Sequence, residues 1–427
     1  MALEDSLAGA LARRAPAAAY RIDTGAPRGG IEPFTLDFSG SGGEYFRVWI
    51  VNLLLNIVTL GFYTPFARRR TAQYFYGHTQ VAGSPLEFTA QQRKMVFGFL
   101  LLVAIYVAFK MAANTGQDST TSVLLLAGAA LAPYFWGSAM RFRLGATRWR
   151  GVRLQFTASW TEVYKASWPV FAIALTWIAV LAVFGAMVGD VSLPARRAAR
   201  LQFVRSVPLV AWLLIAGALV ATFLCIVRLE FNYKSLLVSK AQIGGQAGRW
   251  KPVYGDFVRI WLATLGVFLG SVLVFGIVVA AVVGGSITAF SVGSKLTGPG
   301  LVLAIIAATI AFLFGLLFAS APARAYRQAR MFQLVWNNVG VSRIARFKCR
   351  LRTRRFVLLR LKNMLLALLT LGFYRPFAMV SEYRMKTESV TLHVKGGLDQ
   401  LVGQLAARQQ DGIGDALADA VGLDLVG

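Results

Sequence analysis

Three amide side chains inside apolar stretches of the sequence are the residues best suited to a functional role. Asn52 and Asn56 lie in an apolar run near residues 48–66, and Asn363 lies in another run near 356–380. A carboxamide both donates and accepts hydrogen bonds, and within lipid such a group needs a partner. Two interpretations follow. The amides join neighbouring helices, or they line a polar path for a small solute between the first and the last helix.

The sequence does not indicate acid–base catalysis or proton transfer. No Asp, Glu or His lies within the apolar runs, whereas pumps and proton relays usually place such residues inside the membrane. His78 and His393 are the only histidines, and neither they nor Cys225 and Cys349 have the spacing of a metal site. We therefore expect no catalytic residue, no metal and no cofactor.

The chain that must position these amides has the composition of a membrane protein. Of its 427 residues 56% are hydrophobic, and the mean hydropathy is +0.58. The hydrophobic residues fall into eight runs, near 48–66, 95–113, 121–140, 167–189, 207–227, 257–284, 299–322 and 356–380. A helix needs about 20 apolar residues to cross a bilayer. We predict an all-α integral membrane protein, a polytopic bundle of about eight hydrophobic helices of which at least six cross the membrane.

One motif occurs in both the first and the last run, at an offset of 311 residues. The segments Asn52–Ala67 and Asn363–Ala378 share TLGFY-x-PFA, whose glycine, tyrosine and proline are Gly61, Tyr63 and Pro65 in the first copy and Gly372, Tyr374 and Pro376 in the second. Glycine lets backbones approach closely, aromatic rings suit the boundary between lipid and water, and proline disfavours helix in the residue before it. The motif predicts the end of a membrane helix.

A weaker similarity, at an offset of 68 residues, connects the segments that follow the first and third runs. GHTQVAGSPLEFTA, from Gly77, resembles GATRWRGVRLQFTA, from Gly145, and more divergent segments occur at 231–245 and 336–351. We interpret the repeated unit as a helix, a basic turn and a small β-like element on the cytoplasmic surface. The predicted domains are a disordered tail (1–33), a membrane domain (34–398) whose first and last copies span about 34–90 and 346–398, and an acidic tail (399–427).

The distribution of charge predicts the orientation. The loops after the odd-numbered runs hold 26 Lys or Arg and four acidic residues, whereas the loops on the opposite side and the two tails hold 13 Lys or Arg and 15 acidic residues. Basic loops stay in the cytoplasm. Eight crossings would put the two copies of the motif on opposite faces. If the first and last runs instead dip into the membrane and return, both copies and both termini are cytoplasmic. Both arrangements stay open, because the last run is free of charge only over Met364–Tyr374.

The net charge of +26 would suggest a nucleic-acid partner in a soluble protein, but here we interpret it as the loop charge that sets membrane orientation. We expect no nucleic-acid partner. The same charges make anionic lipid headgroups candidate partners, at about 1 kcal/mol per basic residue near the surface. The candidate contacts flank the two copies of the motif, and they are Arg68, Arg69, Arg70, Arg360 and Lys362.

TLGFY-x-PFA does not stand alone. Upstream lies F-x-x-x-F-x-G-x-G-x-x-Y-F (Phe34–Phe46), and downstream lie G-x-x-L-x-F (Gly83–Phe88) and F-x-x-x-W-N-N (Phe332–Asn338). In these motifs the chain resembles the YjgN family of bacterial inner-membrane proteins, which are built on a domain of unknown function. The resemblance runs from about Phe34 to about Leu401. It implies a multi-pass protein of the bacterial inner (cytoplasmic) membrane, and it attaches no activity to any residue.

Taken with the resemblance, the residues favour a non-enzymatic scaffold or a protein that binds lipids or a partner, where the partner is a second copy of the chain or another membrane protein. The alternative is a passive transporter or channel for a small solute, with Asn52, Asn56 and Asn363 along its route.

Overall fold

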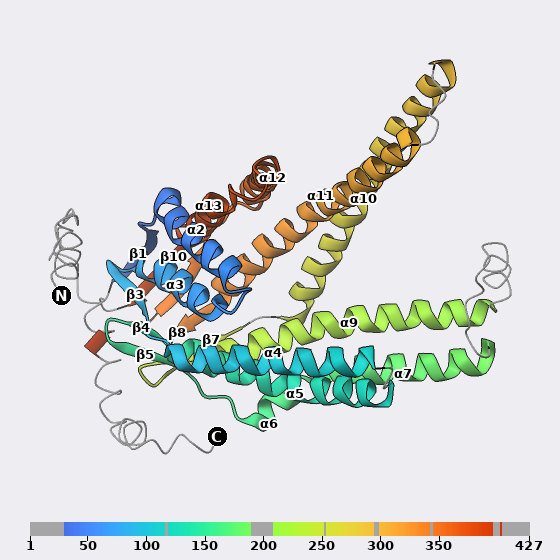
Figure 1. Cartoon of the computed structure of the whole chain (residues 1–427). Coiled ribbons are helices and arrows are strands. Elements are labelled where there is room, and N and C mark those ends of the chain that lie inside the picture. Colours follow the sequence, from blue (N-terminus) through green and yellow to red (C-terminus); the bar gives the residue numbers. More distant parts are fainter. Residues whose placement is uncertain are drawn as a thin grey trace.

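The computed structural model describes residues 30–115, 118–188, 208–251, 253–293, 299–341, 345–395 and 402–403. It has two parts, a closed barrel of short strands and a set of helices that project from the barrel in one general direction (Figure 1). The predicted disordered tail, apart from its last four residues, and almost all of the predicted acidic tail lie outside the described residues.

Strands and helices follow one another in a regular order. A strand, a set of helices and a second strand occur in succession five times, and we call each such succession a unit. The strands are β1 (Ile31–Phe38), β2 (Thr79–Val81), β3 (Ser84–Phe88), β4 (Thr147–Trp149), β5 (Val152–Phe156), β6 (Ala241–Ile243), β7 (Gln246–Trp250), β8 (Val339–Val341), β9 (Ala345–Cys349) and β10 (Val390–Lys395). The two strands of each unit pair with each other, so both ends of every helical excursion return to the barrel.

The helices of the five units differ in length. The first and last units contain short helices, and the three between them contain long ones. The helices are α2 (Gly42–Val58), α3 (Thr64–Gly77), α4 (Gln92–Asn114), α5 (Asp118–Gly145), α6 (Trp160–Ala166), α7 (Trp168–Val188), α9 (Leu209–Lys240), α10 (Tyr254–Gly293), α11 (Pro299–Asn338), α12 (Thr353–Leu369) and α13 (Arg375–Thr387). We call α2–α3 the first hairpin and α12–α13 the last hairpin.

Tight turns connect β2 to β3, β4 to β5 and β6 to β7 around the barrel. Every strand pairs antiparallel with both of its neighbours, in the order β1-β10-β9-β8-β7-β6-β5-β4-β3-β2, and β2 closes the ring against β1. Three of the turns have both central residues at positive φ: Ala82 at 48° and Gly83 at 75°, Arg150 at 49° and Gly151 at 78°, and Gly244 at 52° and Gly245 at 70°. Two-residue turns of this kind match the twist of antiparallel strands, which is why the short β2–β3, β4–β5 and β6–β7 pairs form.

No turn joins β1 to β10, because these strands are the two ends of the ring. Their pairing is longer instead: five Cα partners join β1 to β10, from Ile31↔Lys395 to Thr35↔Thr391, whereas two join β2 to β3. Without a covalent turn, bringing the two ends together costs more chain entropy, and the additional backbone hydrogen bonds of the longer pairing offset part of that cost.

Apolar side chains fill the barrel. Along β10, Val390, Leu392 and Val394 point inward and are buried, while the residues between them are less buried, which is the period-two alternation of a strand with one face in a core. Residues from the other strands complete this core, and the end of α11 covers it with Ala329 and Phe332. Each fully buried Val or Leu contributes about 1.5–3 kcal/mol, so the barrel has a packed core.

The TLGFY motif reverses the chain between the two helices of each short hairpin. In the first hairpin Leu60 and Gly61 adopt φ of 50° and 92°, and their amides donate to the carbonyls of Ile57 and Asn56, which is a Schellman motif. The last hairpin repeats this geometry, with Leu371 at 50° and Gly372 at 95°. Tyr63 and Tyr374 then cap the returning helices, and the buried Pro65 and Pro376 lie in their first turns. The motif therefore does more than end a helix: it turns the chain back to the barrel.

The long helices have the length and composition of membrane spans. Among the described residues four segments qualify, Gln92–Ala112, Trp168–Met187, Leu209–Lys240 and Tyr254–Ala281. Large apolar side chains on them are exposed, including Leu181 at 70% and Leu213 at 61%. Hydrocarbon is the environment in which such a surface is stable, so the structure supports a membrane protein.

The predicted all-α fold class is wrong, because ten strands close a barrel. The β-like elements expected on the surface correspond to these strands, which together form a single closed barrel. The described residues also contain eleven helices rather than about eight, chiefly because the first and last apolar runs are each divided by a TLGFY turn. The four basic loops after the odd-numbered runs each contribute one hairpin of the barrel, and β1 and β10 join them.

Candidate functional site

The amides predicted as site residues bond within their own hairpins. Asn52 is buried and donates to the carbonyl of Ala67 at 3.5 Å, and the buried Asn363 donates to the carbonyl of Ala378 at 3.4 Å. In both copies the acceptor lies 15 residues further along, on the returning helix. Asn56 accepts a hydrogen bond from the Thr64 hydroxyl across the turn at 3.3 Å. These bonds tie the two arms of each hairpin together.

Aromatic rings, not amides, form the contact between the two short hairpins. Phe46 of α2 stacks on Phe377 of α13 with centroids 5.7 Å apart, and Trp49 meets Phe373 edge-on at 6.3 Å. The hypothesis of a shared polar path places Asn52 and Asn363 on a common route between these hairpins. The contacts described there are ring contacts and a hydrogen bond from the Tyr45 hydroxyl to the Met379 sulfur at 3.9 Å, and the two asparagines bond to other groups.

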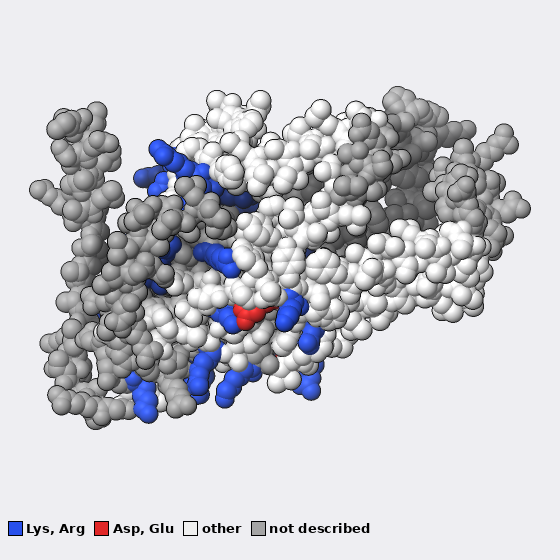
Figure 2. All heavy atoms as spheres, turned by 90° about the horizontal axis from the view of Figure 1, so that it is seen from below, with Lys and Arg blue, Asp and Glu red and all other residues white. Residues whose placement is uncertain are grey.

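A more polar site lies beside the last hairpin. α9, α11, α12 and α13 together line a cleft of about 520 Å³, which we call the basic cleft. Five cationic side chains from all four helices line it, and they are Lys234, Arg324, Arg327, Arg360 and Lys386. Figure 2 shows that Lys and Arg on the visible face gather over the barrel end and the adjoining parts of the helices, while the outer helices are white where they are described.

One carboxylate organises the part of the basic cleft formed by α9 and α11. Glu230 pairs with Lys234 at 2.9 Å and with Arg327 at 3.2 Å, and it accepts a hydrogen bond from the Trp261 indole N–H at 2.8 Å. The Arg327 guanidinium also lies 4.6 Å from the centroid of the Trp261 ring. The ion pairs with Glu230 and the contact with the Trp261 ring hold the two cationic side chains in place.

A second carboxylate supports the part formed by the last hairpin. Glu382 lies 3.8 Å from Arg360 and accepts a hydrogen bond from the Asn363 amide at 3.2 Å. Lys386 follows one turn later on α13, with its ammonium 5.8 Å from the centroid of the Phe356 ring. Burial lowers the pKa of Lys386, a shift that the Glu382 carboxylate opposes and the Arg360 charge increases. Asn363 therefore orients a carboxylate next to the cleft.

The charges of the basic cleft do not balance. Five cations face it, and Glu230 and the adjacent Glu382 are the carboxylates that pair with them among the described residues. An excess of half-buried positive charge attracts an anion, and arginine favours phosphate because its planar fork can bond two oxygens.

Of the five predicted lipid contacts, Arg360 is the one that the structure places in this cleft. Lys362 is exposed on the other side of α12, and Arg68, Arg69 and Arg70 lie on α3 of the first hairpin. Sequence reasoning missed the remaining cations of the cleft. Lys386 carried a signal: at the offset of 311 it corresponds to Phe75, so a lysine occupies a position where the first copy has a buried ring.

No other chemistry is evident in the described residues, where no group of three or more His, Cys, Asp or Glu side chains could hold a metal ion.

Comparison with known proteins places the chain among bacterial membrane proteins. The model of the DUF898 family, described as a bacterial protein of unknown function, matches residues 33–420. Curated relatives named "Inner membrane protein YjgN" include those of Escherichia coli O157:H7, 29% identical over 138 residues, and of Escherichia coli K12, 30% identical over 122 residues. These matches cover 32% and 29% of this chain, and 34% and 31% of the relatives, so the aligned part spans about a third of each relative. No solved structure matches.

Proposed function

Because the chain belongs to the DUF898 family of bacterial proteins, we propose that it is an inner-membrane scaffold that binds anionic phosphate headgroups in its basic cleft. The observation that carries the proposal is the unbalanced charge of this cleft, with five cations against two carboxylates. The cleft lies where apolar helices leave a basic barrel, and this is the depth at which a bilayer presents its phosphates.

The proposed orientation has the barrel in the cytoplasm. All four basic loops contribute strands to it, and cytoplasmic loops carry the excess of Lys and Arg. Since every unit returns to the same barrel, each long pair of helices, α4–α5, α7–α9 and α10–α11, would cross and come back, which makes six crossings. The two short hairpins would dip into the cytoplasmic leaflet only.

Depth limits the short hairpins to one leaflet. Their apolar tips are exposed, with Leu60 at 89% and Leu371 at 90%. Arg68 lies eight residues after the first tip and Arg375 four residues after the second. At 1.5 Å per helical residue these charges come within roughly 6–12 Å of the tips, whereas the hydrocarbon core is about 30 Å thick. The tips would therefore enter the membrane without reaching the other side.

The scaffold role is supported by the closed barrel, which joins five units in one rigid body and leaves no free strand edge among the described residues. Transport of a small solute along Asn52, Asn56 and Asn363 is less favoured, because these amides bond within their hairpins. We propose no catalytic activity.

Native mass spectrometry of the detergent-purified protein, titrated with phosphatidylglycerol or with zwitterionic phosphatidylcholine, tests the proposal. We expect the wild-type chain to retain more phosphatidylglycerol. Arg324→Gln and Lys386→Gln should each weaken that preference by roughly fivefold, the equivalent of about 1 kcal/mol per charge.

Arg249→Gln is the matched control, since Arg249 lies on the barrel strand β7, away from the basic cleft. If all three variants bind phosphatidylglycerol as the wild type does, the cleft is not a headgroup site. If Arg249→Gln lowers binding as much as the other two, the attraction comes from overall charge and the proposal fails.

A further inference from the structure

A second cleft opens on the opposite face of α11, and its polarity changes from one end to the other. It has a volume of about 580 Å³, within the range of small-molecule sites, and lies between α10, α11 and α12. Pro322, Tyr326 and Arg330, spaced four residues apart, form the wall contributed by α11. Arg324 and Arg327, which line the basic cleft, lie on a different face of the same helix. The two sites are therefore distinct.

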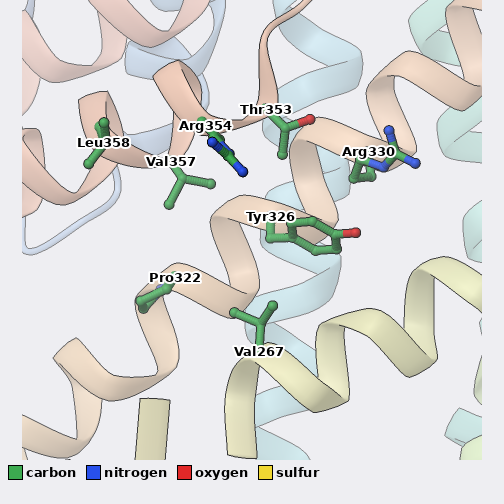
Figure 3. A pocket seen from close by; sticks show the side chains of 8 residues that line it. All are labelled: Val267, Pro322, Tyr326, Arg330, Thr353, Arg354, Val357 and Leu358. Carbon is green, nitrogen blue, oxygen red and sulfur yellow. The ribbon is translucent and has the colours of Figure 1, made fainter. Parts of the chain in front are cut away.

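Figure 3 shows how the side chains are ordered along this cleft. Arg330 and the Tyr326 hydroxyl lie at one end, beside Thr353, while Pro322 and Leu358 lie toward the other. The Arg354 guanidinium points into the space between the two ends. An occupant would meet hydrogen-bond donors at one end and hydrocarbon at the other.

The direction of this gradient matches a membrane lipid. α11 leads directly into strand β8 of the barrel, so Arg330 lies nearer the barrel than Pro322 does, by eight residues or about 12 Å of helix. The polar end of the cleft thus faces the barrel, and the apolar end faces the exposed apolar parts of the long helices. A phospholipid in the barrel-side leaflet has the same orientation, with phosphate toward the barrel and acyl chains away from it.

The two arginines have no carboxylate partner in the described part of the chain. Arg330 donates to the Gln333 side-chain oxygen at 3.3 Å, and Arg354 is exposed at the start of α12. A phosphate diester would supply the missing negative charge. Neither a free phosphate nor a fatty chain alone would use both ends of the cleft.

We propose that this cleft is a seat for one phospholipid molecule, whose phosphate contacts Arg330 and Arg354 and whose acyl chain lies over Val267 and Leu358. The proposal requires that the helices lie in a bilayer, but it does not depend on headgroup binding in the basic cleft.

Photo-crosslinking in lipid nanodiscs tests this seat. The probe is phosphatidylglycerol with a diazirine in one acyl chain, and the labelled peptides are identified by mass spectrometry. We expect labels to concentrate in α10 around Val267 and in α12 around Val357 and Leu358. Val267→Trp fills the apolar end and should lower that labelling several-fold. Leu269→Trp is the matched control, because Leu269 is 57% exposed on the opposite side of the same helix and does not line the cleft, and it should leave the labelling unchanged.

The polar end is tested with Arg354→Glu, which should lower the labelling of α10 and α12 by more than the roughly fivefold expected for loss of one charge, while Arg354→Lys retains it. The thermal midpoint of each variant shows that it is folded. Equal labelling of all lipid-facing helices, or no effect of Val267→Trp, would overturn the proposal. So would full competition by water-soluble glycerophosphate, which has no acyl chain. If Lys386→Gln lowers this labelling and Val267→Trp does not, the lipid sits in the basic cleft instead.

Discussion

The first and last hairpins have the same backbone conformation at their turns, but their side chains differ where the two helices of each hairpin pack together. Both reverse through TLGFY with φ of 92° and 95° at the glycine, and in both an asparagine donates across the hairpin to an alanine carbonyl 15 residues on. The first hairpin closes over aromatic rings. Tyr45 and Phe75 lie 4.9 Å apart and pack with Phe38 and Tyr383.

At the corresponding positions the last hairpin carries charge. Phe356 takes the place of Tyr45, and Lys386 that of Phe75, so a cation lies over a ring where the first hairpin has two rings in contact. Likewise Arg360 and Glu382 replace Trp49 and Thr71. A half-buried lysine costs folding free energy relative to a phenylalanine. That the last hairpin retains one at the edge of the basic cleft suggests that one copy serves stability and the other binding.

The largest effect should come from placing the charge of the last hairpin in the first. Phe75→Lys removes ring contacts with Phe38, Tyr45 and Tyr383 and buries an ammonium that has no carboxylate facing it. We expect a loss of about 3–5 kcal/mol in the free energy of unfolding, read as a lower thermal midpoint in detergent. Adding Thr71→Glu, which reproduces Glu382, should recover part of this loss. Gln73→Lys, exposed on the same helix, should be neutral. An unchanged midpoint for Phe75→Lys would show that the aromatic core is unimportant.

The common turn can be tested by Gly61→Ala and Gly372→Ala. Each alanine would be held at a φ near 92–95°, which L-residues rarely adopt, although nothing lies within 4 Å of the added methyl group. We expect each variant to lose about 1–3 kcal/mol, and by similar amounts. Gly77→Ala, in a helix with open space around it, should cause no loss. Unequal losses would mean that the two turns are not equivalent.

Replacing the charge of the last hairpin with a ring should separate binding from stability. Lys386→Phe restores the residue of the first copy and removes a cation whose pKa burial already lowers. We expect the free energy of unfolding to stay the same or rise by about 1 kcal/mol. Retention of phosphatidylglycerol should fall roughly fivefold. A variant that is less stable yet binds normally would reverse the assignment of roles.

The smallest effect concerns alkaline pH. Burial, reinforced by the Glu44 charge, raises the pKa of Tyr74 to about 12, from its ordinary value of 10.0. The folded chain therefore keeps the Tyr74 proton at pH values where the unfolded chain loses it. The stability that this proton contributes is fully present below pH 10 and is lost as the pH rises toward 12. Tyr74→Phe should shift the midpoint of alkaline unfolding slightly upward. Tyr76→Phe, two residues further on, is the control, and an equal shift there would contradict the role of Tyr74.

The sequence predicted the repeated parts better than the assembled whole. The offset of 311 residues located both hairpins, because the glycine and proline of TLGFY-x-PFA have fixed conformational roles. The sequence did not predict the barrel, because strands as short as Thr79–Val81 are too short to show an alternation of apolar and polar residues. In addition, each strand pairs with one strand of its own unit and one strand of another unit. The glycine turns after Ala82 and Arg150 were the local signals of a hairpin.

The candidate site was harder to predict, because it depends on which helices become neighbours. Arg360 was recognised from its proximity to the motif. Lys234 and Arg327 come from segments about a hundred residues apart, and Glu230 brings them together. Asn363 was found for its amide in an apolar run, but its partner Glu382 appears only once the hairpin folds back.

The pairing of β1 with β10, which closes the barrel, has a consequence for biosynthesis. Phe38 leaves the ribosome roughly 350 residues before Val390, which at 5–20 residues per second is a delay of roughly 20–70 s. Throughout that interval the edge of β1 that pairs with β10 has no partner, while the intervening helices are synthesised. The barrel can therefore close only after all the helices between β1 and β10 have been synthesised.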